Sequence, residues 1–122
     1  MKILKIAPGT SPETMDIPDD LSAMQEIVGG LIQVLYPFTD SVALVCNDEA
    51  KLWGLPPNRA LRDPDTGVVY DIICGTMFLC GAYANMDHFT DLTEEQLAYY
   101  TTYYNNPEFF LSAENTIIVM KS

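Results

Sequence analysis

The most apolar part of the chain reads Val68-Val69-Tyr70-Asp71-Ile72-Ile73-Cys74-Gly75-Thr76-Met77-Phe78-Leu79-Cys80. Strands that are covered on both faces have nearly continuous apolar runs of this kind. A glycine inside such a run, here Gly75, often marks a bend or a bulge. The stretch therefore predicts one bent strand, or two strands, passing through the core of a sheet.

Shorter runs rich in Ile, Val and Leu lie on both sides of this stretch, separated by proline- and glycine-containing turns, and they predict further strands. These strands are expected at 2–7, 14–17, 31–36, 41–46 and 116–120, with 51–53 returning against 41–46 as a second hairpin. The segment 55–65 contains three prolines, so we expect no regular element there.

Two helices are predicted from their terminal signals. Asp19 or Asp20 can cap a helix over about 19–29, which the pair Gly29-Gly30 would end. The sequence Thr93-Glu94-Glu95-Gln96 matches a capping box that opens a helix over about 93–104. Its inner stripe would consist of Leu97, Tyr100, Thr101 and Tyr104. We therefore predict an α+β fold: a single small domain over 1–122, with a mixed, mostly antiparallel sheet and two helices.

The charge balance limits the class of partner. Seventeen Asp and Glu against six Lys and Arg give a formal net charge of −11, which opposes approach to a polyanion, so we expect no direct nucleic-acid binding. The acidic surface either keeps the domain soluble or imitates nucleic acid and docks on a basic partner. No apolar stretch approaches the length of a membrane span, which favours no membrane association and a cytoplasmic location.

Metal, cofactor and catalytic chemistry find little support in the residue types present. The three cysteines, Cys46, Cys74 and Cys80, lie in apolar stretches and are interpreted as small buried hydrophobic residues. His88 is the only histidine and has just two nearby carboxylates, so we interpret it as a surface-loop residue and expect no metal site and no cofactor. No nucleophile or phosphate-loop motif occurs, and no catalytic residue is assigned.

Arg59 and Arg62 are the two arginines of the chain, three positions apart in the proline-rich segment. Because a guanidinium presents a planar fork of donors, they could form a clamp for an anion or nucleotide phosphate, with Asn58 as a polar contact and Trp53 or a tyrosine as a stacking platform. Alternatively, both arginines pair with Asp63, Asp65 or a more distant carboxylate and only hold the loop.

Four tyrosines are packed into the second predicted helix as Tyr99-Tyr100 and Tyr103-Tyr104. Adjacent helical residues diverge by about 100°, so part of this set must reach the surface. Tyr99 and Tyr103 could form a protein interface, including that of a homodimer through this helix. Alternatively, the rings cover the sheet and only their hydroxyl groups reach water.

The segment Asn47-Asp48-Glu49-Ala50-Lys51-Leu52-Trp53-Gly54-Leu55-Pro56-Pro57-Asn58-Arg59-Ala60-Leu61-Arg62-Asp63 resembles the family known as Domain of Unknown Function 3846. The resemblance extends to the double glycine at 29–30, the strand at 69–76 and the late turn at 106–110, and so covers nearly the whole chain. It implies a setting, namely small proteins of Firmicutes, their phages and conjugative elements, and so a location in the cytoplasm of a bacterial host cell.

The first hypothesis is a non-catalytic binding protein of a phage or mobile genetic element that acts in counter-defence by sequestering a small anionic, nucleotide-like ligand. The alternative is an acidic DNA mimic that blocks a basic host protein such as a restriction or CRISPR nuclease. A small enzyme acting on a nucleotide is the third hypothesis. Neutralising Arg59 and Arg62 should abolish the first activity and spare the second.

Overall fold

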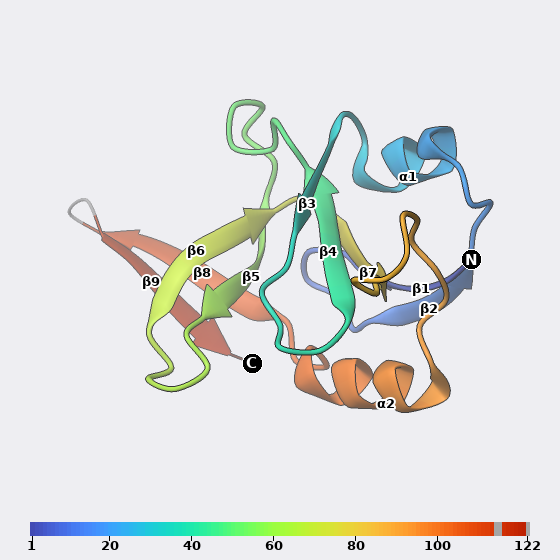
Figure 1. The fold of residues 1–122 in the computed structure, drawn as a ribbon. Helices are drawn as coiled ribbons and strands as arrows, with labels where there is room; N and C mark the ends of the chain where they lie inside the picture. Colours follow the sequence, from blue (N-terminus) through green and yellow to red (C-terminus); the bar gives the residue numbers. More distant parts are fainter. Residues whose placement is uncertain (114–115, 122) are drawn as a thin grey trace.

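The computed structural model describes residues 1–113 and 116–121 of the chain, and this part contains two helices and nine strands (Figure 1). Every strand pairing in the described part is antiparallel, which confirms an α+β fold of the mostly antiparallel kind. The elements are β1 (Lys2–Ile6), β2 (Glu13–Asp16), α1 (Leu21–Val28), β3 (Ile32–Leu35), β4 (Val42–Asn47), β5 (Pro57–Arg62), β6 (Val69–Cys74), β7 (Met77–Gly81), α2 (Glu94–Tyr103), β8 (Glu108–Ala113) and β9 (Thr116–Lys121).

A five-stranded sheet with the order β2-β1-β7-β4-β3 forms the centre of the molecule. Successive side chains of β7 point to opposite faces, so Leu79 and Phe78 belong to two different core clusters. Helix α2 and the β5–β6 pair cover the face of Leu79, and α1 covers the face of Phe78. The two helices therefore lie on opposite sides of the sheet, as Figure 1 shows.

The stretch 68–80 forms two strands, which was the second of its two predicted forms. The two strands belong to different sheets, which was not predicted. Strand β6 pairs with β5, whereas β7 lies between β1 and β4. The break falls at Gly75, whose φ of 77° is in the left-handed region. This conformation favours glycine, and a Cβ atom at this position, 2.9 Å from Leu55 Cδ1, would also displace the end of the Leu55 side chain.

Two expectations for the segment 51–65 were wrong. Residues 48–54 form consecutive turns, so 51–53 is not a strand of a second hairpin. Residues Pro57–Arg62 form β5, although no regular element was predicted there. Proline is tolerated as the first residue of a strand, and the residues after it pair with the apolar strand β6, for example Ala60 with Ile72.

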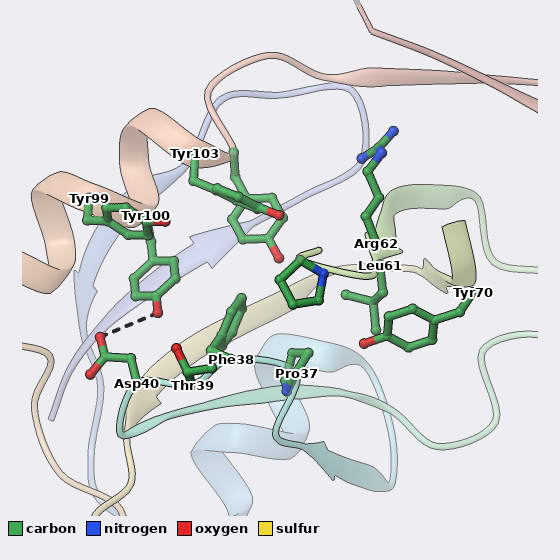
Figure 2. Close-up of a pocket in the computed structure, with 12 residues that line it drawn as sticks. Pro37, Phe38, Thr39, Asp40, Leu61, Arg62, Tyr70, Tyr99, Tyr100 and Tyr103 are labelled. Atoms are coloured by element: carbon green, nitrogen blue, oxygen red, sulfur yellow. Dashed lines mark hydrogen bonds between the residues drawn. The ribbon is translucent and has the colours of Figure 1, made fainter. Parts of the chain in front are cut away.

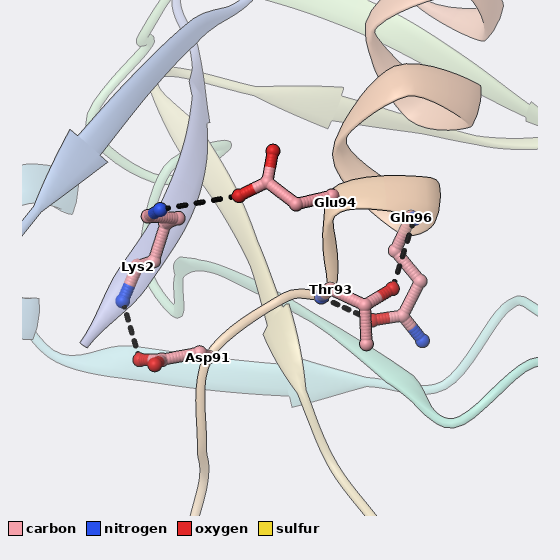
Figure 3. A network of polar contacts seen from close by, with 5 residues as sticks. All are labelled: Lys2, Asp91, Thr93, Glu94 and Gln96. Carbon is pink, nitrogen blue, oxygen red and sulfur yellow. Dashed lines mark hydrogen bonds and ion pairs between the residues drawn. The ribbon is translucent and has the colours of Figure 1, made fainter.

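The two helices begin and end where their signals predicted. Asp20 caps α1 by accepting a bond from the amide of Ala23, and Gly29 ends it with a φ of 81°. Thr93 and Gln96 form the full capping box of α2, shown in Figure 3. Lys2 joins this end of α2 to β1, through its side chain to Glu94 at 3.3 Å and through its backbone amide to Asp91 at 2.8 Å.

Strands β8 and β9 form a separate hairpin beside β5 and β6 (Figure 1). The expected final strand at 116–120 is thus confirmed, and β8 is its partner. In the described part of the chain, neither helix has the length and apolar character needed to cross a membrane.

Candidate functional site

A pocket of about 310 Å³ opens where α2, the loop at 37–40 and the β5–β6 hairpin meet (Figure 2). Tyr70 of β6 stands on one side of it, and the tyrosines of α2 stand on the other. Aromatic side chains and prolines make up most of the wall. The lining residues are Pro37, Phe38, Thr39, Asp40, Leu61, Arg62, Pro64, Tyr70, Tyr99, Tyr100, Tyr103 and Tyr104.

The aromatic rings form a buried inner wall and an exposed outer rim. Phe38 packs against Tyr100 with ring centroids 4.8 Å apart, and both Tyr100 and Tyr104 are buried. The rings of Tyr99 and Tyr103 are stacked at a centroid distance of 6.2 Å, and both are more than half exposed, as is Tyr70. The rim therefore presents three partly exposed tyrosines to a ligand.

Asp40 supplies the acceptor groups of the pocket. Its carboxylate accepts bonds from the hydroxyl of Tyr100 at 3.4 Å and from the side-chain amide of Gln96 at 3.2 Å. Burial, and then the charge of Asp40, raise the pKa of Tyr100 well above its usual range. Burial also raises the pKa of Tyr104. Both phenols therefore remain protonated at neutral pH.

Among the residues that line this pocket, Arg62 is the one cation. Its two terminal nitrogens hold the Glu108 carboxylate at 3.0 and 2.9 Å, and its side chain is 22% exposed. This hydrogen bonding to Glu108 raises the pKa of Arg62. Because Glu108 offsets the positive charge, the site favours a ligand that carries little negative charge.

Asn58 and Arg59 lie in the core, each with 0% exposure. The side-chain amide of Asn58 donates to the carbonyl oxygens of Ile6 at 2.8 Å and Gly75 at 2.9 Å. Arg59 donates to Thr10 O at 2.7 Å, to Tyr104 O at 2.9 Å and to both oxygens of Asn58. Burial lowers the pKa of Arg59, and the nearby Glu108 carboxylate opposes this shift.

This geometry gives the two arginines different roles. Arg62 does pair with a distant carboxylate, whereas Arg59 is bound mainly to backbone carbonyl groups. Since neither Asn58 nor Arg59 has accessible surface, a ligand could contact them only after a rearrangement. Of the proposed clamp, only Arg62 lines the pocket.

The remaining predicted residues lie as follows. Trp53 is exposed in the turns at 48–54 and is not part of the wall of this pocket. Tyr99 and Tyr103 are exposed as expected and line the pocket, so a role in a protein interface stays a prediction. His88 is exposed beside Asp87, and the described residues contain no cluster of His, Cys, Asp or Glu suited to a metal ion.

Sequence reasoning missed Phe38, Asp40 and Tyr70 as pocket residues. Phe38 and Asp40 lie between the strands predicted at 31–36 and 41–46, and Tyr70 lies in the apolar stretch 68–80. Their common feature is a polar or aromatic side chain next to a strand end, which is too frequent in proteins to single out a site. Only the packing of α2 against the β5–β6 hairpin brings them together.

Comparison with known proteins gives one match. Neither the curated proteins nor the solved structures contain a match to this chain. The sequence model of the family described as "Domain of unknown function (DUF3846)" matches residues 1–105, which include both helices and the whole wall of the aromatic pocket but not the β8–β9 hairpin. The chain therefore belongs to the DUF3846 family.

Proposed function

We propose that this protein is a non-catalytic binding protein whose aromatic pocket holds a small ligand with a flat heteroaromatic ring, such as a nucleotide-like molecule. The observation that carries the proposal is the aromatic wall, with three exposed tyrosines around buried rings. A base stacked on an aromatic side chain contributes about 1–3 kcal/mol. The pocket volume of about 310 Å³ matches the lower end of small-molecule sites.

The polar groups suit the edges of such a ring. Asp40 can accept bonds from ring or exocyclic N–H groups, and the phenols of the rim can donate or accept. Arg62 has N–H groups beyond the two that hold Glu108, and these can meet one anionic group. Since the net charge is −11, a nucleoside or a singly charged nucleotide is favoured over a polyphosphate.

The setting that the family resemblance implies gives such binding a purpose. In a phage or another mobile genetic element, a protein that removes a nucleotide signal from solution would deprive a host immune effector of its activator. Sequestration requires only affinity and abundance, which agrees with the lack of an assigned catalytic residue. We therefore extend the proposal to counter-defence.

The test begins with native mass spectrometry of the freshly purified protein, followed by denaturation and identification of any released molecule. Thermal-shift and calorimetric titrations with a panel of nucleosides, cyclic nucleotides and nucleoside mono- and diphosphates follow. The double variant Tyr70→Ala/Tyr103→Ala should bind at least about tenfold more weakly, because it loses two stacking surfaces. Arg62→Gln should weaken the binding of nucleotides more than the binding of the corresponding nucleosides.

Matched controls separate the pocket from general effects. Tyr36→Ala removes an exposed tyrosine outside this pocket, and Lys51→Gln removes an exposed cation that pairs with Asp71 at 2.6 Å. Both controls should bind like the wild type. The proposal is wrong if no member of the panel binds at about millimolar concentration, or if the controls lose affinity as the pocket variants do.

A second cavity favours the alternative function, in which an acidic surface blocks a basic host protein. It has a volume of about 850 Å³ and lies between α1 and the loop at 82–89. No Lys or Arg lines it, whereas Asp19, Asp20, Asp40 and Asp87 do, above an apolar floor that includes Met24 and Phe89. This combination suits a basic, partly apolar segment of a partner protein.

The alternative function, binding of a basic host protein, predicts that affinity depends on salt concentration. A complex with a basic protein should weaken as NaCl is raised, and Asp19→Asn/Asp87→Asn should weaken it further, since both carboxylates are exposed. Asp16→Asn/Asp65→Asn removes two exposed carboxylates outside this cavity and serves as the control. If a complex is captured and both double variants bind it equally, the cavity is not its binding surface.

A further inference from the structure

Asp40 is the one carboxylate among the residues that line the aromatic pocket. It is exposed at the end of the loop at 37–40, and its side chain points toward the hydroxyl of Tyr100 (Figure 2). Arg62 lies on the opposite side of the pocket in the same view. The pocket therefore has an acceptor group on one side and a partly neutralised cation on the other.

The hydrogen bonds of Asp40 leave room for a ligand. A carboxylate offers about four acceptor positions on its two oxygens. Oδ1 accepts from the backbone amide of Ser41 at 2.7 Å and from the side-chain amide of Gln96 at 3.2 Å. Among the described residues, Oδ2 accepts only from the hydroxyl of Tyr100, at 3.4 Å, which is longer than an ordinary O–H···O bond. Oδ2 can therefore take a donor from a ligand.

The chemistry of a carboxylate selects among flat nitrogen heterocycles. An ionised carboxylate accepts hydrogen bonds and donates none, so it suits a ring edge with two adjacent N–H donors. Among the common RNA bases, guanine alone has such an edge, formed by its ring N1–H and its exocyclic amine. Adenine and cytosine place a ring acceptor beside the amine, and uracil places a carbonyl on each side of its N–H. Each of these would bring an acceptor against the oxygens of Asp40.

We propose that the aromatic pocket selects bases of the guanine type and that Asp40 is the residue that determines this specificity. This selectivity presupposes the proposed binding of a flat heteroaromatic ligand and specifies its class. The base would stack on the exposed tyrosines of the rim with its N1–H and amine edge at Asp40. A phosphate on the far side of the ligand would then extend toward Arg62.

Tyr100 can complete the contact with such a base. The carbonyl oxygen of guanine lies next to N1–H and needs a donor. Burial, and then the charge of Asp40, raise the pKa of Tyr100 well above its usual range, so this phenol keeps its proton. Because its bond to Asp40 is long, the hydroxyl can turn to the guanine carbonyl while the base donates to Asp40.

The exposure of Asp40 limits the size of the preference. Water competes for an exposed carboxylate, so a base that fails to donate to it leaves it hydrated and not unpaired. We therefore expect a preference of about tenfold, far below the roughly 10⁴-fold that a fully enclosed polar site reaches.

A series of cyclic nucleotides tests the preference on the wild type alone. Calorimetric titrations would compare the 3′,5′-cyclic monophosphates of guanosine, inosine and adenosine. They share the sugar, the phosphate and a purine ring, and inosine differs from guanosine only in lacking the exocyclic amine. The guanine ligand should bind about tenfold more tightly than either of the others. The corresponding nucleosides give the same comparison if the cyclic phosphate prevents binding.

The variant Asp40→Asn assigns the preference to this carboxylate. An amide replaces one acceptor oxygen with a donor, and its oxygen and amine match the amine and ring nitrogen of adenine. The guanosine-to-inosine ratio of affinities should fall to about one, and the adenine ligand should bind at least as tightly as the guanine ligand. Asp16→Asn makes the same change at an exposed carboxylate outside the pocket and should keep the wild-type order.

The outcomes separate this selectivity from binding as such. Equal affinity of the wild type for all three bases means that the pocket binds without selecting guanine, which overturns the inference and leaves the proposed binding function intact. A guanine preference that persists in Asp40→Asn overturns the role of Asp40. If neither these ligands nor any other nucleoside or nucleotide binds at about millimolar concentration, the binding function and the selectivity are both wrong.

Discussion

Arg59 donates four hydrogen bonds from a guanidinium with no exposed surface, and its Nε has no partner among the described residues. Replacing it with Met should lower the free energy of unfolding by about 3–5 kcal/mol, because the buried carbonyl groups of Asn58 and Tyr104 and the carbonyl of Thr10 lose their donor. Urea denaturation followed by circular dichroism measures this change.

Lys51 provides the comparison for Arg59. It forms a short ion pair with Asp71, but it is exposed, so Lys51→Met should cost less than about 1 kcal/mol. If Arg59→Met lowered the free energy of unfolding as little as Lys51→Met, the hydrogen bonds of Arg59 would not be important for stability. A ligand-binding role for this residue would then have to be tested.

The two buried tyrosines of α2 should make the protein sensitive to alkali. Burial raises the pKa of Tyr100 and Tyr104 above the ordinary value of 10.0. The two phenols therefore contribute fully to the free energy of unfolding below pH 10.0. This contribution is lost as pH rises above that value, because the tyrosines of the unfolded chain lose their protons first. Between about pH 9 and pH 11 the pair should account for a loss of about 2 kcal/mol in unfolding free energy.

The double variant Tyr100→Phe/Tyr104→Phe isolates this effect. Its unfolding free energy should fall less steeply over the same pH range than that of the wild type, because phenylalanine does not titrate. Urea titrations at several pH values compare the two slopes. Equal slopes would mean that other groups, such as the buried thiols of Cys46 and Cys80, cause the alkaline loss.

At the scale of single elements, the capping box of α2 should contribute measurably to stability, although the helix has only 10 residues. The hydroxyl oxygen of Thr93 accepts a hydrogen bond from the backbone amide of Gln96 at 3.1 Å. The side-chain oxygen of Gln96 accepts one from the backbone amide of Thr93 at 3.0 Å. Thr93→Ala removes the first of these bonds and should cost about 1 kcal/mol in thermal or urea unfolding.

Thr102→Ala is the matched control within the same helix. Thr102 is exposed in the last turn, where alanine is the better helix former, so this change should be neutral or stabilising by a few tenths of a kcal/mol. Equal destabilisation by the two substitutions would contradict a specific role of the cap.

The sequence allowed the helices to be predicted closely because caps are local chemistry. Asp20, Gly29 and Thr93 act within four residues of their own position. Strand β5 is not predicted because the three prolines of 55–65 argue against a regular element, although proline blocks pairing only at its own amide. The aromatic pocket could not be predicted, since its walls come from three elements that only the tertiary fold assembles.

For the whole molecule, the excess of carboxylates predicts stabilisation by salt. A net charge of −11 on a chain of 122 residues produces self-repulsion in the folded state, and salt screens it. The midpoint of thermal unfolding should rise by several degrees between about 0.01 and 0.5 M NaCl. A falling midpoint would mean that attractive ion pairs outweigh the repulsion.

Two further conditions define this salt effect. KCl should give the same rise as NaCl, because screening depends on ionic strength and not on the identity of a monovalent cation. The rise should also be the same at two protein concentrations about tenfold apart, which separates screening within one chain from any association of two chains.

The hydrogen bonds of Arg59 also constrain when the chain can fold during its synthesis. They join the carbonyl groups of Thr10 and Tyr104, which belong to opposite ends of the family-matched region. Leu92 likewise donates to the carbonyl of Lys2 in the first strand. The core cannot close until the end of α2 has left the ribosome, several seconds after the first strands at a rate of about 5–20 residues per second. During that interval the nascent chain exposes its apolar strands, and a pause in translation ahead of α2 would prolong this exposure.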